Sequence, residues 1–250
     1  MTAQWTAIIL AGQRPGPDPL ASQFGGEWKA LVPVAGEAML THVVRTLRTV
    51  PEIARIVVLA QDVERMRGAV DAGGGAIILP SGAGISASIR SVAGTDAAPW
   101  PVFVTTADHV LLTRAMVEEF LAGAQVAPPG QAVPDVAVGM VEYQVMLTQF
   151  PDARRTWLRF ADGAWSGANL FALTNARANA ALDLWAEAEQ DRKKPLKLFL
   201  HFGIGLAIRA ITRTIGLGDA LARAGQRLGL TARLIPMSDP VAAIDVDKVS

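Results

Sequence analysis

Cysteine is absent from the 250-residue sequence. Disulfide frameworks, thiolate zinc sites and cysteine nucleophiles are therefore excluded. Net charge is absent too, because 23 basic residues balance 23 acidic ones, so no global electrostatic field attracts nucleic acid. The first residues show no basic segment followed by an apolar one, the pattern of a secretory signal. We therefore expect a cytoplasmic protein that does not bind nucleic acid.

Long hydrophobic runs are also missing. The most apolar stretch, residues 196–211, is interrupted by Lys197, His201 and Arg209. It falls short of the roughly 20 residues that span a bilayer. Internal repeats and low-complexity tracts are not found, and the first glycine-rich loop matches neither GxxxxGK[ST] nor GxGxxG. A membrane span and the two common phosphate-loop signatures are thus excluded at these places.

Apolar runs that alternate with helical patterns fill the first two thirds of the chain. This alternation predicts an α/β fold with a mostly parallel sheet flanked by helices. We expect a single domain over residues 1–250, irregular structure over 143–163, and a helical insertion or lid over about 183–229. The predicted strands are 6–10, 56–59, 76–79, 102–105 and 136–141, and the predicted helices are 39–49, 61–72, 86–92 and 113–124.

The first predicted strand runs directly into a loop of glycine, arginine and proline. Glycine lets the backbone approach a ligand closely. Arg14 and the later Lys29 place positive charge where a phosphate chain would lie. The alternative is an ordinary turn after a strand. The residues of this candidate nucleotide loop are Leu10, Ala11, Gly12, Gln13 and Gly16.

Carboxylates stand at two places suited to a metal ion. Asp108 follows the strand at 102–105, where ligands bind in parallel sheets. Asp245 and Asp247 are spaced by two, which puts both on one face of an extended segment. Mg²⁺ takes one or two carboxylates together with phosphate oxygens and water. The alternatives are a capping or turn role for Asp108 and a solvated strand edge for the pair.

Two further polar groups lie beside small residues. Ser86, Ser88 and Arg90 open a helix after a glycine-rich loop, where free N–H groups suit a phosphate or a base edge. Asn169 follows a small-residue turn and can both donate and accept hydrogen bonds. Helix capping, solvent exposure of Arg90 and a plain turn at Asn169 are the alternatives.

Taken together, these segments resemble the MobA-like nucleotidyltransferases, which transfer NMP from an NTP to a phosphorylated acceptor. The motifs occur in the family's order along nearly the whole chain. They are Leu10-Ala11-Gly12, Lys29-Ala30-Leu31 with Val34-Ala35-Gly36-Glu37-Ala38-Met39-Leu40, Thr105-Thr106-Ala107-Asp108, Ser166-Gly167-Ala168-Asn169 and Asp245-Val246-Asp247.

The resemblance implies a GT-A-like (Rossmann-like) fold and a role for each motif. The loop with Arg14 would hold the triphosphate, and Lys29 would neutralise its charge. Asp108, with Asp245 or Asp247, would hold Mg²⁺. Ser86 to Arg90 would lie near the base, which CTP and GTP both fit, and Asn169 would lie near the acceptor. Gln13 departs from the family's usual second glycine, and the gap to Lys29 is several residues longer than usual.

Two other functions are compatible with the sequence. A GT-A-type glycosyltransferase also needs a nucleotide and a metal, although a lysine suited to a triphosphate favours NTP chemistry. A catalytically inactive nucleotide-binding module is the other, because Gln13 alters the loop. The basic and apolar stretch from Lys193 to Arg213 could lie on a membrane surface or cover a lipid-linked acceptor. A helical lid or a homodimer interface is the favoured interpretation.

Overall fold

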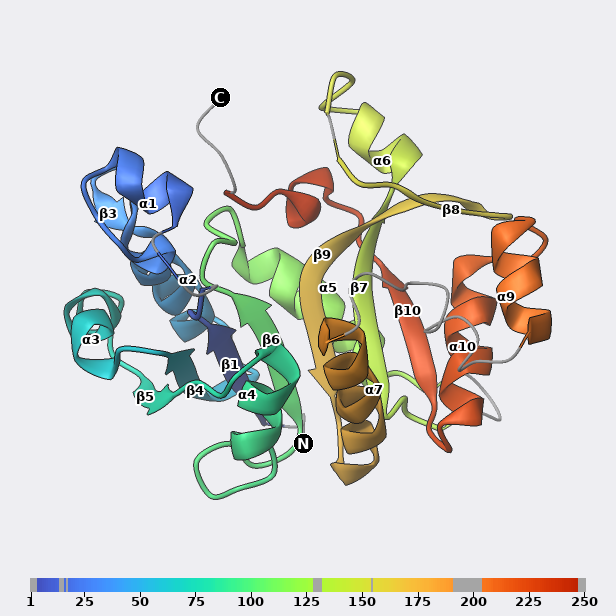
Figure 1. Ribbon diagram of the computed structural model, residues 1–250, viewed down its shortest axis with the longest axis horizontal. Coiled ribbons are helices and arrows are strands. Elements are labelled where there is room, and N and C mark those ends of the chain that lie inside the picture. The colour runs from blue at the N-terminus through green and yellow to red at the C-terminus, as the bar shows by residue number, and fades with distance from the viewer. Residues whose placement is uncertain are drawn as a thin grey trace. The chain divides into compact units, whose positions relative to one another are not determined.

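The computed structural model describes residues 4–13, 16, 18–127, 132–153, 155–190 and 204–246. The chain divides into two compact units, one of residues 1–118 with 244–250 and one of residues 119–243. Both contain a sheet flanked by helices (Figure 1). The expectation of a single domain stays a prediction.

The sheet of the first unit has the strand order β6-β1-β4-β5. β1 pairs in parallel with β4 and with β6, and β4 pairs in parallel with β5. Val, Ile and Ala fill these strands on both faces, as expected of a parallel sheet that is covered on both sides. The four predicted strands are confirmed, with small shifts at their ends. The bounds are β1 Trp5–Leu10, β4 Ile53–Ala60, β5 Ile77–Pro80 and β6 Val102–Thr106.

The helices of this unit follow their predicted apolar spacing. α2, for example, buries Met39, Leu40, Val43 and Leu47 and packs against β1 and β4. Ahead of α2, a two-stranded hairpin turns at Ala35 and Gly36, both at positive φ. The bounds are α1 Pro19–Gln23, a 3-10 helix at Lys29–Leu31, β2 Pro33–Val34, β3 Glu37–Ala38, α2 Met39–Arg48, α3 Val63–Ala72, α4 Ile85–Val92 and α5 Arg114–Gln125, which crosses into the second unit.

Two glycines, Gly68 within α3 and Gly73 directly after it, allow a matched test of this packing. A Cβ at Gly73 would lie 2.7 Å from Val44 Cβ, whereas a Cβ at Gly68 meets nothing within 4 Å. We expect Gly73→Ala to lower the free energy of unfolding by about 1–3 kcal/mol through overpacking. Gly68→Ala, in an exposed helix interior, should raise it by about 0.5–1 kcal/mol. Urea unfolding measures both, and equal effects would contradict the packing of α3 on α2.

The second unit has the sheet order β10-β7-β9, with β8 also paired to β9. β10 is parallel to β7, while β9 is antiparallel to β7 and to β8. The α10 helix packs against β10. The bounds are β7 Val136–Glu142, α6 Tyr143–Leu147, β8 Leu158–Phe160, β9 Gly163–Leu173, a 3-10 helix at Ala176–Ala178, α7 Asn179–Gln190, α9 Ile204–Ile211, α10 Leu217–Arg227, β10 Ala232–Pro236 and a 3-10 helix at Pro240–Ala243.

The prediction of irregular structure over 143–163 is wrong in part, because α6 and β8 lie within it. Both are short, and β8 is held by its pairing with β9 rather than by a pattern of its own. β10 was not predicted either, and it is placed by pairing with β7. The sheet of the second unit is accordingly mixed, with β10 parallel to β7 and with β9 antiparallel to both β7 and β8.

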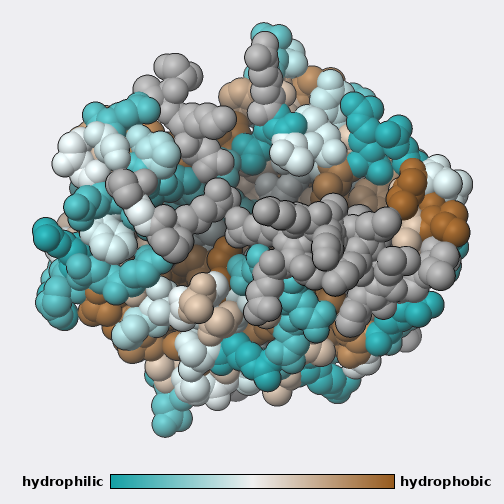
Figure 2. Space-filling view, viewed as in Figure 1, coloured by the Kyte–Doolittle hydropathy of each residue, from teal (hydrophilic) through white to brown (hydrophobic). Residues whose placement is uncertain are grey.

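α9 presents apolar side chains at the molecular surface (Figure 2). Ile208 and Ile211 are 54% and 62% exposed. Within the described residues, no helix is both long and apolar enough to cross a membrane. The lysines at 193, 194 and 197 lie outside the described residues.

Candidate functional site

The loops after β1 and β6 lie side by side at the carboxyl edge of the first unit's sheet. Ala11 N–H donates to Leu59 O at 2.9 Å, and Ala107 N–H donates to Leu10 O at 3.0 Å. These two bonds continue the parallel pairing by one residue past the ends of β1 and β6, so the first residues of both loops are held in register with the sheet. Ligands bind at this edge of open parallel sheets. The loop starting at Gly12 and the loop carrying Asp108 therefore share the place where the sequence predicts the nucleotide.

An ion pair joins two of the three residues that the sequence assigns to catalysis, the third being Arg14. Lys29 Nζ lies 2.6 Å from Asp108 Oδ2, and the two side chains are 20% and 19% exposed. Lys29 is the first residue of the 3-10 helix that follows α1, and Asp108 follows β6. The two residues are 79 positions apart in the sequence. The sequence identified both residues but not their pairing.

The other carboxylate oxygen of Asp108, Oδ1, has no hydrogen-bond partner among the described residues. This oxygen is also buried. A buried charged oxygen is costly when it is left unsatisfied. Its presence next to a paired ammonium therefore points to a cationic or donating ligand at this position.

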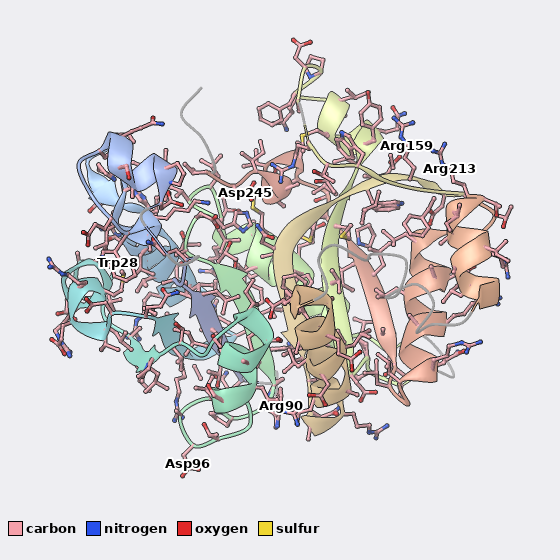
Figure 3. The ribbon with its side chains drawn as sticks, in the orientation of Figure 1. Trp28, Arg90, Asp96, Arg159, Arg213 and Asp245 are labelled. Carbon is pink, nitrogen blue, oxygen red and sulfur yellow. The ribbon has the colours of Figure 1, made fainter. Side chains whose placement is uncertain are left out.

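The Asp245 segment passes beside Asp108. Val246 N–H donates to Asp108 O at 3.0 Å, and Val246 also packs against the small core of Leu20, Val32 and Met39. Figure 3 labels Asp245 on this segment. The structure thus brings Asp245 next to Asp108 in the backbone, whereas Asp247 lies outside the described residues. Among the described residues, no group of three or more His, Asp or Glu side chains is arranged to hold a metal ion.

Asp108 and Asp245 suit Mg²⁺ more than a metal that needs a full protein cage. Mg²⁺ is commonly held by one or two carboxylates, with phosphate oxygens and water completing its shell. The buried, partnerless Oδ1 of Asp108 is a carboxylate oxygen ready for such an ion. The donor set therefore fits Mg²⁺ that arrives together with a phosphate ligand.

Removing the Lys29 ammonium tests whether Asp108 can take a divalent cation. We expect Lys29→Met to tighten Mn²⁺ binding by the nucleotide-free protein about tenfold, because the carboxylate loses the cation that now occupies it. Loss of the free Mn²⁺ signal in electron paramagnetic resonance measures binding. Adding Asp108→Asn to this variant should cancel the gain. Unchanged Mn²⁺ affinity in Lys29→Met would contradict a metal site at Asp108.

Gln13 links the first loop to its surroundings. Its side-chain Oε1 accepts from Lys29 N–H at 2.9 Å, and its Nε2 donates to Glu27 O at 2.8 Å and to Gly16 O at 3.3 Å. Its backbone N–H donates to Gln61 Oε1 at 3.1 Å, and its carbonyl accepts from Gln61 Nε2 at 2.6 Å. Arg14 lies outside the described residues.

No motif in the sequence points to Gln61. It follows β4, the strand beside β1, so it stands at the same carboxyl edge as Gly12 and Gln13. A Cβ at Gly12 would lie 3.4 Å from the Gln61 carboxamide, which shows how closely the two segments approach. The one sequence feature that could have pointed to Gln61 is its place as a polar residue directly after a buried strand.

The loop before α4 lies at the same sheet edge, since Ser81 N–H donates to Ala60 O at 2.9 Å. Ser88 Oγ donates to Gly84 O at 2.6 Å and accepts from Gly82 N–H at 2.8 Å, so this hydroxyl holds the loop. Ser86 is 2% exposed. Figure 3 shows Arg90 well apart from Asp245. Base contact by these residues stays a prediction.

Asn169 belongs to the second unit and has an unusual backbone. It lies inside β9, not after a turn as predicted, because the strand begins earlier, at Gly163. Its φ is +52°, and the β7–β9 register shifts there: Val138 faces Phe171 while Met140 faces Gly167. Asn tolerates the left-handed region better than most residues. Strained residues of this kind cluster at ligand sites, and an acceptor contact for Asn169 stays a prediction.

Comparison with known proteins finds a family model and solved structures that are similar to this chain. The family model for the MobA-like NTP transferase domain matches residues 7–199. A hypothetical transferase structure from Thermus thermophilus superposes with a TM-score of 0.81 at 26% identity, covering 98% of this chain and 97% of that chain. A search of curated proteins finds no match.

Two solved enzymes of lower identity share the fold. CMP:2-keto-3-deoxy-manno-octonic acid synthetase, complexed with CTP, has a TM-score of 0.60 at 14% identity, covering 98% of this chain and 94% of that chain. The 4-diphosphocytidyl-2C-methyl-D-erythritol synthase of Anaerococcus prevotii has a TM-score of 0.55 at 10% identity, covering 99% and 94%. The fold predicted from the sequence is confirmed.

Proposed function

Since the chain belongs to the MobA-like NTP transferase family, we propose that it transfers a nucleoside monophosphate from an NTP to a phosphorylated small-molecule acceptor. The observation that carries the proposal is the Lys29–Asp108 ion pair. It lies at the carboxyl edge of a parallel sheet, beside a glycine loop, with one Asp108 oxygen buried and partnerless among the described residues.

In the proposed reaction, an acceptor phosphate oxygen attacks the α-phosphorus of the NTP. A new bond forms between that oxygen and the α-phosphorus, and the bond from the α-phosphorus to the oxygen bridging to the β-phosphate breaks. Pyrophosphate leaves with that bridging oxygen. No covalent intermediate with the protein is needed, so catalysis consists of positioning and charge stabilisation.

Each site residue has a role in this proposal. The Lys29 ammonium moves from Asp108 to the triphosphate and neutralises charge that develops as pyrophosphate leaves. The N–H groups of the Leu10–Gly16 loop, with Arg14, hold the phosphates. Asp108 with Asp245 or Asp247 holds Mg²⁺, which when bound neutralises phosphate oxygens. Ser86, Ser88 and Arg90 contact the base, and Asn169 contacts the acceptor.

CTP is the first nucleotide to test. Two similar structures are enzymes whose names carry CMP or a cytidyl group, one of them holding CTP. Their low identity makes this a proposal for the present chain, and GTP remains the second candidate. The acceptor is proposed as a phosphorylated sugar or alcohol.

Calorimetric titration with each of the four NTPs and Mg²⁺ tests the binding half of the proposal. We expect one NTP to bind clearly more tightly than the others, and Lys29→Ala to weaken it at least about tenfold by removing one charge from the triphosphate site. Arg67→Ala, an exposed cation of the same unit paired with Glu64, is the matched control. Tighter binding of a nucleotide sugar than of any NTP would contradict the proposal and favour a glycosyltransferase.

A further inference from the structure

We infer that Gln13 is a positioning residue of the site, acting with Gln61 to fix the loop and the backbone at Lys29 before a nucleotide binds. The inference rests on the proposed function and deepens it. The network contains five hydrogen bonds and uses every polar group of Gln13. Three segments of one sheet edge, after β1, after β4 and before the 3-10 helix, meet at this residue.

The chemistry of the network requires a carboxamide at position 13. One end must accept from Lys29 N–H, and the other must donate to the carbonyl oxygens of Glu27 and Gly16. A carboxylate accepts only, so a glutamate would set negative charge against two carbonyl oxygens. A glycine would lose these three bonds and keep only the two that run from its backbone to Gln61.

The network adds little to global stability. All but one of its bonds are solvent-exposed, and the exception, from Lys29 N–H, is partly buried. Exposed polar groups that lose a partner bond to water instead, so breaking such bonds leaves nothing buried and unsatisfied. Gln13, whose polar groups are all hydrogen-bonded although it is exposed, therefore serves the geometry of the site rather than the stability of the fold.

Lys29 is the residue whose position depends on this geometry. Its N–H is held by Gln13 Oε1 at 2.9 Å, and its Nζ reaches Asp108 Oδ2 at 2.6 Å. Catalysis by positioned charge falls steeply with small displacements. Gln13 therefore acts through Lys29. Because Gln13 fixes the backbone of Lys29, the side chain always starts from the same place and its ammonium reaches the same position.

The network also connects the two departures noted in the sequence. Gln13 stands where the resembling family usually has glycine, and the segment from there to Lys29 is longer than usual. In the structure the longer segment includes α1, and its far end at Glu27 and Lys29 is bonded to the Gln13 side chain. The Gln13 side chain thus holds the C-terminal end of this longer segment, at Glu27 and Lys29, against the loop after β1.

Three variants test the inference: Gln13→Glu, Gln61→Glu on the other side of the network, and Gln23→Glu as a matched exposed control at the end of α1. In nucleotide-free protein, we expect amide hydrogen exchange over residues 27–31 to accelerate at least about tenfold in Gln13→Glu. Urea midpoints should match that of Gln23→Glu. With the NTP that binds best, Gln13→Glu should lower kcat at least about tenfold and change KM less, because the displaced Lys29 ammonium still attracts the bound triphosphate but no longer lies where charge develops in the transition state.

The double variant separates coupling from general damage. Gln13→Glu with Gln61→Glu should cost less than the sum of the single variants, because both break one network. Unchanged exchange over residues 27–31 in both single variants overturns the inference, as does unchanged kcat where the wild type is active. If no NTP binds the wild type, the proposed function fails, and hydrogen exchange alone then decides whether Gln13 positions Lys29.

Discussion

Asp108→Asn is expected to lower the rate of nucleotidyl transfer at least about a hundredfold, the loss typical when one preorganised electrostatic group is removed. Asparagine keeps the shape of the side chain and can still accept a hydrogen bond from Lys29. It loses the negative charge that pairs with Lys29 at 2.6 Å and the charged Oδ1 that is buried beside it. Pyrophosphate release under saturating NTP and acceptor measures the effect.

Variants of both members of the Lys29–Asp108 ion pair, alone and together, extend this test. Lys29→Ala should have an effect of similar size, and the double variant should cost less than the product of the two, because both residues belong to one ion pair. Asp96→Asn, the same substitution at an exposed site of the same unit, is the control (Figure 3). An Asp108→Asn enzyme with activity within threefold of that control would show that Asp108 has no part in the reaction.

The second large effect is expected at Asp135, in the second unit. Its side chain is 4% exposed and ties three segments together. Oδ2 accepts from Thr231 N–H at 2.7 Å and from Thr231 Oγ1 at 2.9 Å, and Oδ1 accepts from Asn175 Nδ2 at 2.7 Å. Arg177 Nε lies 3.9 Å away. The carboxylate thus joins the start of β7 to the residues before β10 and before α7.

We expect Asp135→Asn to lower the free energy of unfolding at pH 7 by about 3 kcal/mol. Asparagine has one acceptor where the site offers donors on both sides, so its NH₂ group must face either the Thr231 or the Asn175 donor. Urea unfolding measures the loss, with exposed Asp152→Asn as the control in the same unit. A loss equal to that of the control would contradict the network.

The same site predicts a pH dependence. Burial acts to raise the pKa of Asp135, but hydrogen bonds from Thr231 and Asn175, with the charge of Arg177, outweigh burial and hold the pKa below its usual value of 3.8. A carboxyl with a lowered folded pKa stabilises the fold above its unfolded pKa, and this contribution is lost as the pH falls through the folded pKa. The stability difference between wild type and Asp135→Asn should therefore be constant above about pH 5 and shrink below pH 3.8.

The sequence predicts the first unit well because its elements have local signals. The strands at Trp5–Leu10 and Val102–Thr106 are apolar runs bounded by turn residues, and α2 shows its buried face in the spacing of Met39, Val43 and Leu47. Lys29 and Asp108 could be identified for the same reason, since each belongs to a short motif. Their ion pair could not, because it depends on how two segments far apart in sequence meet in space.

Other features have no local signal. β10 is placed by pairing with β7, about 96 positions away, and β8 has three residues and one partner strand. The left-handed backbone of Asn169 arises from a register shift between β7 and β9. The network of Gln13 depends on Gln61, 48 positions later. The sequence marks Gln13 only as a departure from a motif, whereas the contacts show what its side chain does.

One measurement tests the central claim most directly: pyrophosphate release with each of the four NTPs and Mg²⁺, against a pool of phosphorylated sugars and alcohols. Wild type is compared with Lys29→Ala and Asp108→Ala. The account predicts release with one NTP and one class of acceptor, with CTP first, and its loss in both variants. Binding of an NTP without release in any combination would contradict the account and indicate an inactive nucleotide-binding module.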